Sequence, residues 1–166
     1  MGEHYAARCG MRLLPALQVI ELAGQRCLLA LHGDQFCTQD VAYQQFRALV
    51  RDPQWQREFL AKPLAERRAI AAQLRAKSKE ANSIKAEDIM DVTPSEIEVA
   101  LVQHQCSVLI HGHTHRPARH AVALANGSSA ERIVLGDWTE QYCYLQWKNN
   151  ESELLWSVRQ LKADTR

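Results

Sequence analysis

Three histidines stand within five residues of this sequence, from His111 to His115, directly after a short apolar run. Neutral imidazole is a good ligand for zinc, manganese, iron and similar ions. Gly112 lets the backbone turn tightly and come close to a bound ion or phosphate. If this segment is extended, the side chains of His113 and His115 point the same way, because side chains alternate with period two. The residue types and spacing therefore predict that His113 and His115 bind metal in one pocket.

A second apolar run also ends in a His-Gly step. Residues 26–31 lead directly into His32-Gly33-Asp34. Sites in α/β sheets gather at the carboxyl ends of strands, so His32 is a candidate partner of the histidine cluster. Taken alone, a histidine at this position is more often an ordinary polar strand end. We interpret the remaining histidines outside the cluster as structural, namely His4, His104 and His120.

The elements that position these histidines are predicted to be strands and helices of an α/β fold. Residues 17–22 and 26–31 flank Gly24-Gln25, which predicts a β-hairpin. A helix is predicted to begin at Thr93-Pro94, because proline fits the first helical position. Residues 107–110 form a short buried strand. Further strands separated by Gly, Asn and Asp turns are predicted at residues 121–124, 133–135, 142–145 and 154–158.

From Asp40 to about Asn82 the pattern becomes helical and basic. Between Arg51 and Lys85 there are nine Lys or Arg and four Asp or Glu, while the whole chain carries +1. One interpretation is a solvated helical surface. The other is a lid whose apolar side chains line a groove for acyl chains and whose cations face anionic phospholipid. The apolar candidates are Trp55, Phe59, Leu60, Leu64, Ile70 and Leu74, and the cationic ones are Arg51, Arg57, Arg67, Arg68, Arg75 and Lys77.

Composition narrows the function class. The net charge of +1 gives no general attraction to nucleic acid. Five cysteines, an odd number without CxxC spacing, favour reduced thiols over a disulfide framework. No apolar run approaches the roughly 20 residues that span a bilayer, and the amino-terminal residues have no signal-peptide core. The sequence therefore predicts a cytoplasmic protein, attached at most to a membrane surface.

The histidine segments resemble the last two motifs of the calcineurin-like metallophosphoesterases. A longer series, in the same order along nearly the whole chain, is similar to the UDP-2,3-diacylglucosamine hydrolase family of that superfamily. This series comprises Leu31 to Asp34, Cys37-Thr38, Asp40, Tyr43, Phe46-Arg47, Arg75 to Ser83, Ile89 to Val92 and His111 to Pro117. The resemblance implies two facing mixed sheets flanked by helices. Residues 1–166 would be the second half of one such domain, with a helical lid inserted at residues 40–85.

The resemblance also implies an activity and a set of roles. Members of the family hydrolyse the pyrophosphate bond of UDP-2,3-diacylglucosamine with metal-activated water, giving 2,3-diacylglucosamine 1-phosphate and UMP in lipid A biosynthesis. They lie on the cytoplasmic face of the inner membrane, against an anionic lipid surface. Carried over to this sequence, the ligands of a two-manganese cluster are His32, His113 and His115. The glucosamine-phosphate end of the substrate would be contacted by Asp40, Ser78, Asn82, Lys85 and His113.

Three family motifs that supply the other metal ligands do not occur here, namely Asp-x-His, Gly-Asp-x-x-Asp and Gly-Asn-(Arg/His)-Asp. They include the carboxylate that bridges the two metals. We therefore expect a C-terminal portion that binds metal weakly and has essentially no turnover by itself. No catalytic residue beyond the metal ligands is expected in it.

Two alternatives stay open. One is a phosphoesterase that acts on soluble nucleotides, which the apolar lid disfavours. The other is a truncated, non-catalytic domain that binds lipid or a partner. Oligomeric state is not predicted.

Overall fold

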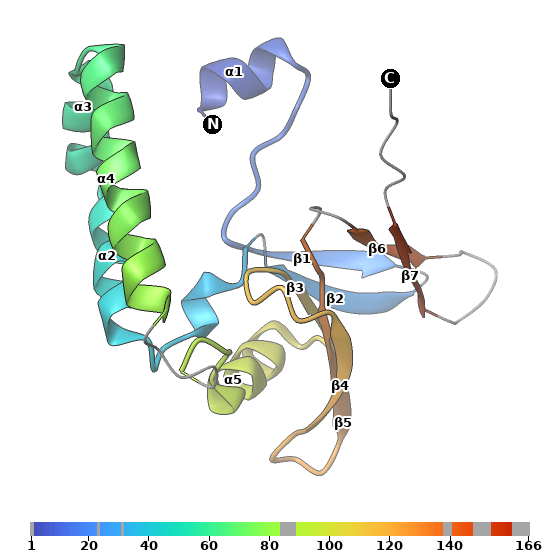
Figure 1. Ribbon diagram of the computed structural model, residues 1–166. Coiled ribbons are helices and arrows are strands. Elements are labelled where there is room, and N and C mark those ends of the chain that lie inside the picture. The colour runs from blue at the N-terminus through green and yellow to red at the C-terminus, as the bar shows by residue number, and fades with distance from the viewer. Residues whose placement is uncertain are drawn as a thin grey trace. The chain divides into compact units, whose positions relative to one another are not determined.

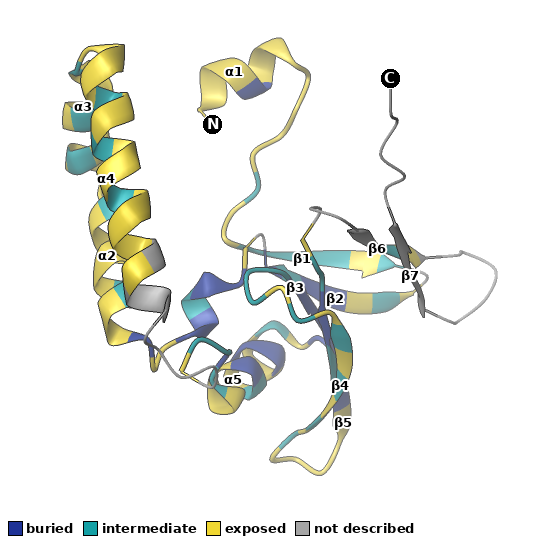
Figure 2. Ribbon diagram, viewed as in Figure 1, coloured by how far each residue is buried: buried dark blue, intermediate teal, exposed yellow. Residues whose placement is uncertain are grey.

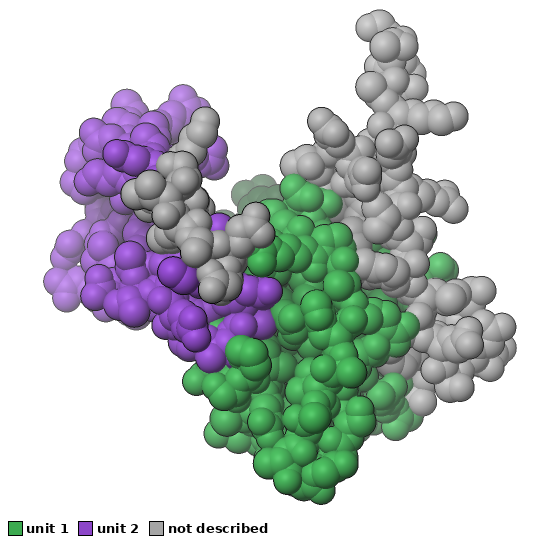
Figure 3. All heavy atoms as spheres, turned by 60° about the horizontal axis from the view of Figure 1, so that its bottom comes forward, with its two compact units in different colours: residues 1–36, 94–166 green, residues 37–93 purple. Residues whose placement is uncertain are grey.

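The computed structural model of this chain describes residues 2–22, 24–30, 32–83, 89–137, 141–147 and 154–160. The chain separates into two compact units, which Figure 3 shows in different colours. We name Met1–Phe36 with Pro94–Arg166 the sheet unit, and Cys37–Thr93 the helical unit.

A five-stranded mixed sheet forms the centre of the sheet unit, in the order β1-β2-β3-β5-β4 (Figure 1). β1 (Leu17–Leu22) and β2 (Gln25–Ala30) make the predicted hairpin. β3 (Val108–His111) lies parallel to both β2 and β5 (Ser129–Val134), and β4 (Ala118–Ala123) lies antiparallel to β5. The predicted α/β class is confirmed.

The two faces of this sheet are covered by different elements of the sheet unit. Leu145 of β6 (Gln141–Trp147) packs against a cluster on one face, formed by Cys27, Val108, Ile110 and Ile133. Leu28 and Leu109 point to the opposite face, because side chains alternate along a strand. α5 (Pro94–His104) contacts β3 and begins at the predicted proline.

The two-sheet arrangement expected from the resemblance is only partly represented in the described residues. β6 pairs with β7 (Leu154–Gln160) in a separate two-stranded antiparallel sheet. The described part of the chain therefore contains one mixed sheet and one antiparallel pair. The short helix α1 (Glu3–Arg8) and the 3-10 turn η1 (Asp34–Phe36) complete the described elements of this unit.

Three helices, α2 (Val41–Arg51), α3 (Pro53–Ala61) and α4 (Leu64–Ser83), make up the helical unit and confirm the predicted helical stretch. Every residue of α2 and α3 is described, and none is buried (Figure 2). Among the described residues, no helix has both the length and the apolar character to cross a bilayer. The interpretation of residues 40–85 as an inserted lid stays a prediction.

Candidate functional site

Two neighbouring parallel strands bring the histidine loops to the same edge of the sheet. β2 and β3 pair in parallel from Cys27 opposite Val108 to Leu29 opposite Ile110. The loops that follow them are joined directly, because Gly112 N donates to His32 O at 3.1 Å. This edge is the carboxyl end of both strands, where sites of α/β folds gather.

His32 and His113 lie side by side in the sheet unit. Their ring centroids are 4.6 Å apart, and the ring planes are inclined by 58°. The His32 side chain is about half exposed, at 51%. Two of the three predicted metal ligands are therefore adjacent, with one of them open to solvent.

The segment from Gly112 to His115 turns back on itself, so the extended conformation that we assumed for it is wrong. His113 and His115 have φ of +70° and +52°, in the left-handed region that residues other than glycine rarely adopt. Thr114 N donates to Gly112 O at 2.9 Å and closes the turn. The period-two argument failed because the strand conformation ends at His111. Left-handed non-glycine residues cluster at functional sites, which keeps this turn of interest.

Two carboxylates to which the sequence reasoning assigned no role lie beside the histidines. Asp34 is 1% exposed, and its Oδ1 lies 3.3 Å from His32 Nδ1. Asp137 Oδ2 lies 3.8 Å from His115 Nδ1. A carboxylate next to one imidazole nitrogen orients the ring so that the other nitrogen can act as a ligand. The sequence feature that could have identified Asp137 is its position just after β5. The carboxyl end of β5 lies at the same edge of the sheet as the histidine loops, because β5 is parallel to β3.

The donor set fits part of a divalent metal centre. Thr114 Oγ1 is buried in the histidine turn without a hydrogen-bond partner in the described part of the chain. Unpartnered buried hydroxyls are costly, so this atom indicates that the turn is built for a further group. Among the described residues, however, no three His, Cys, Asp or Glu side chains converge as a set able to hold a metal ion. His32, His113 and His115 do not by themselves complete a two-metal centre.

The four other predicted substrate-contact residues belong to the helical unit. Asp40 is 6% exposed and caps α2, with its Oδ1 accepting from Tyr43 N at 3.1 Å. Ser78 is exposed on α4, and Asn82 lies four residues later in the same helix. The Asn82 side chain and the whole of Lys85 lie outside the described residues. The predicted contacts of these residues stay predictions.

The predicted lid residues of the helical unit lie largely at its surface. Leu60 and Leu64 are 63% and 55% exposed, and Trp55 stacks on Phe59 with centroids 5.0 Å apart. Arg67 is half-buried, and its Nε has no hydrogen-bond partner among the described residues. The described cations that are exposed are Arg51, Arg57, Arg68, Arg75 and Lys77.

No protein-family model matches this chain. Several curated proteins do. The chain is 54% identical over 141 residues to the UDP-2,3-diacylglucosamine hydrolase of Cellvibrio japonicus, and 51% identical over 138 residues to that of Serratia proteamaculans. It is 45% identical over 155 residues to the same enzyme of Tolumonas auensis. These matches cover 85%, 83% and 93% of this chain.

The chain is homologous to the UDP-2,3-diacylglucosamine hydrolases. The predicted resemblance to this family is confirmed. A match over 141 of 166 residues includes residues 26–141 wherever it begins, so both histidine loops and the helical unit fall within it. The chain spans 58%, 57% and 63% of the length of these three hydrolases.

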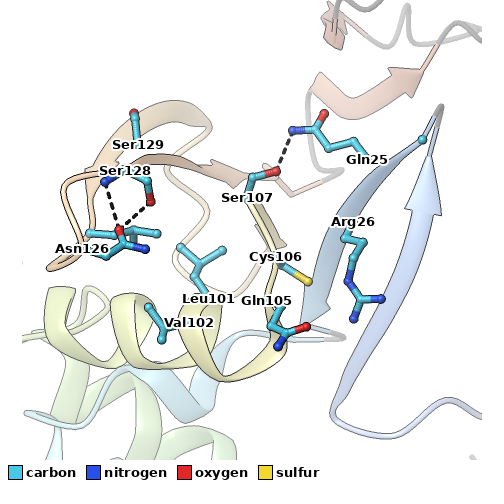
Figure 4. A pocket seen from close by; sticks show the side chains of 12 residues that line it. Gln25, Arg26, Leu101, Val102, Gln105, Cys106, Ser107, Asn126, Ser128 and Ser129 are labelled. Carbon is cyan, nitrogen blue, oxygen red and sulfur yellow. Dashed lines mark hydrogen bonds between the residues drawn. The ribbon is translucent and has the colours of Figure 1, made fainter.

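A cavity of about 580 Å³ lies in the sheet unit of this UDP-2,3-diacylglucosamine hydrolase homologue, and Figure 4 shows the side chains that line it. It is lined by residues at the starts of β2 and β3, the end of α5 and the β4–β5 turn, among them Arg26, Cys106 and Asn126. Because β2 and β3 are parallel, their starts lie at the edge opposite the histidine loops. None of the predicted histidine ligands is among the described residues that line this cavity.

Two buried thiols, Cys27 and Cys106, lie near this edge. Burial raises the pKa of the Cys27 thiol to about 11, and neighbouring Cys106 adds to the effect. Burial also raises the pKa of Cys106, against the opposing influence of the Arg26 guanidinium. Since the thiolate is the reactive form, burial disfavours nucleophilic chemistry at both side chains.

Proposed function

We propose that this chain is part of a metal-dependent pyrophosphohydrolase that cleaves UDP-2,3-diacylglucosamine to 2,3-diacylglucosamine 1-phosphate and UMP in lipid A biosynthesis. The observation that carries the proposal is the 54% identity over 141 residues to a hydrolase of that name. The side-by-side rings of His32 and His113, at the carboxyl ends of two parallel strands, support it.

The proposed role of the sheet unit is to supply imidazole ligands to a two-manganese cluster. These ligands are His32, His113 and His115, with the remaining ligands supplied from outside the described residues. Asp34 orients the ring of His32, and Asp137 stands near His115. When bound, two metals activate water and offset the charge of the phosphoryl oxygens. Packing of Leu145 on the mixed sheet supports the assignment of β6–β7 to a second sheet of the phosphoesterase sandwich.

The proposed role of the helical unit is to bind the lipid end of the substrate. Asp40, Ser78, Asn82 and Lys85 would contact the glucosamine phosphate, together with His113 of the sheet unit. The exposed Leu60 and Leu64 suit acyl chains and not a soluble nucleotide, so the lipid substrate is favoured. The exposed cations suit an anionic membrane surface, which gives a peripheral location on the cytoplasmic face of the inner membrane.

The activity is tested in a chimera in which this chain replaces the homologous part of the Cellvibrio japonicus hydrolase. We expect manganese-dependent release of UMP from UDP-2,3-diacylglucosamine and much less from a UDP-sugar without acyl chains. In the chimera, His32→Ala or His113→Ala should lower the rate more than about 100-fold, since even groups behind the ligands contribute 10–100-fold. His104→Ala, which removes a histidine outside the site, is the control and should change little. A folded chimera that prefers the soluble substrate contradicts the proposal.

The chain alone is expected to bind Mn²⁺ only weakly and to hydrolyse no substrate. Among its described residues, no three His, Cys, Asp or Glu side chains converge to hold an ion, whereas Mn²⁺ favours several oxygen ligands and this hydrolysis needs a two-metal clamp. Electron paramagnetic resonance titration measures the affinity, and phosphorus NMR measures hydrolysis. A 1:1 Mn²⁺ complex of submicromolar affinity, or clear hydrolysis by the chain alone, would contradict this expectation.

Membrane attachment is tested by neutralising Arg67 and Arg68 to Gln in the chimera. Each cation near an anionic surface contributes about 1 kcal/mol, so the double variant should bind anionic vesicles about tenfold less tightly, with Arg67 contributing less because it is half-buried. Sedimentation with phosphatidylglycerol-containing vesicles at low salt measures this. Neutral vesicles are the matched control, and unchanged binding to anionic vesicles counts against the membrane role.

A further inference from the structure

His111, the first histidine of the cluster, is fully buried and has no part in the proposed ligand set. It is the last residue of β3. Its Nδ1 lies 2.8 Å from Gly112 O, and its Nε2 lies 3.4 Å from Arg132 Nη1. A carbonyl accepts and a guanidinium only donates, so Nδ1 donates to Gly112 and Nε2 accepts from Arg132. The ring orientation is therefore set from both sides.

The same ring fills the space beside the other histidine loop. A Cβ on Gly33 would lie 2.9 Å from His111 Nδ1, 3.0 Å from its Cβ and 3.2 Å from its Cγ. Gly33 also has φ of +104°, which glycine adopts freely. His111 thus touches the residue after His32 and holds the carbonyl of the residue before His113.

We propose that His111 is a positioning residue: its imidazole links the His32 and His113 loops and holds them at the separation seen between their rings. The hydrogen bond from Gly112 N to His32 O ties the loops together, the hydrogen bond from His111 Nδ1 to Gly112 O fixes the turn that carries His113, and the His111 ring packs beside Gly33 of the His32 loop. The proposal deepens the proposed function, because those two rings are the proposed ligands. The spacing itself requires no metal and no substrate, so its tests stand if the proposed function fails.

The role of the ring is tested by comparing His111→Asn with His111→Leu in the isotope-labelled 166-residue chain. The Asn amide nitrogen takes the place of Nδ1 and keeps the hydrogen bond to Gly112 O. Leu fills the buried site and offers no donor. We expect the nuclear Overhauser cross-peak between the His32 and His113 rings, 4.6 Å apart, in the wild type and His111→Asn, and its loss in His111→Leu.

A role in core filling alone gives the opposite order, because Leu suits a buried site better than Asn does. Survival of the cross-peak in His111→Leu, or its absence from the wild type, overturns the proposal. Circular dichroism confirms that each variant compared is folded.

A second test probes the contact between His111 and the His32 loop. Gly33→Ala and Gly127→Ala both place Ala at positive φ, at +104° and +81°, but only the Gly33 Cβ meets His111. We expect Gly33→Ala to raise the equilibrium constant of unfolding about tenfold more than Gly127→Ala does, a coupling typical of residues in contact.

The excess should shrink severalfold in a His111→Ala background, where the ring contacts are gone and only the Cβ contact at 3.0 Å remains. Equal effects of the two glycine substitutions, or an excess that the His111→Ala background leaves unchanged, contradict the proposed contact of His111 with the His32 loop. Urea unfolding of the wild type, His111→Ala and the four glycine variants gives the measurement.

Discussion

The sheet unit and the helical unit use similar apolar side chains in different ways. In the sheet unit, Leu28, Leu109 and Ile133 are fully buried between layers. In the helical unit, α2 and α3 bury no residue, and Leu60 and Leu64 stay mostly exposed. Burial fixes the strands of the first unit and therefore the loops that carry His32 and His113. The apolar surface of the second unit is free to serve binding, as the proposed lipid site requires.

Exchanging one leucine in each unit for alanine tests this difference most strongly. Leu109→Ala removes a fully buried side chain from β3 and should cost about 2–5 kcal/mol of unfolding free energy. Leu60→Ala, at a position 63% exposed, should stay within about 0.5 kcal/mol. Urea denaturation of both variants gives the comparison. Similar losses for the two would show that the helical unit has a core of its own around Leu60.

The pH dependence of stability separates buried from exposed thiols inside the sheet unit. The pKa of Cys27 is raised from 9.0 to about 11, so the folded state favours the neutral thiol. The unfolding free energy keeps its full value for this group below pH 9, where the thiol is neutral in both states. It decreases as the pH rises toward 11, because the unfolded state then loses the proton first. The loss should be about 3 kcal/mol at most, since the shift from 9.0 to about 11 spans two pKa units and one unit corresponds to 1.36 kcal/mol.

Cys27→Ala should flatten the fall in unfolding free energy above pH 9, because it removes the titrating group. Cys9→Ala is the matched control, since Cys9 is exposed. The unfolding free energy of Cys9→Ala should fall above pH 9 as that of the wild type does. Unfolding curves of the three proteins from neutral to alkaline pH measure the effect. If the unfolding free energy fell equally in Cys27→Ala and Cys9→Ala, groups other than Cys27 would cause the loss of stability at alkaline pH.

The strands and the rough position of the site could be predicted because both depend on local pattern. The apolar run before His32 and the one before Gly112 each make a strand, and parallel pairing brings their ends together. The conformation beyond each strand could not be predicted in the same way. His113 and His115 adopt positive φ, which residues other than glycine rarely do, and His115 lies near Asp137 from beyond β5. His111 shows the same limit, because its buried role depends on Gly33 and Arg132 across the fold.

Substitutions of Asp40 are expected to have the smallest effects, and they distinguish a role in capping α2 from a role in binding substrate. Asp40 caps α2 through Tyr43 N at 3.1 Å, and Asp52 caps α3 through Trp55 N at 2.8 Å. Replacing either by Ala should cost about 1 kcal/mol of unfolding free energy, while Asn keeps most of the cap. Asp40→Asn in the chimera should therefore retain stability, and raise KM if the carboxylate contacts substrate. Asp52→Asn should change neither quantity. An unchanged KM in Asp40→Asn would leave Asp40 as a helix cap alone, and the helical unit would then depend on its other predicted residues for recognition of the sugar phosphate.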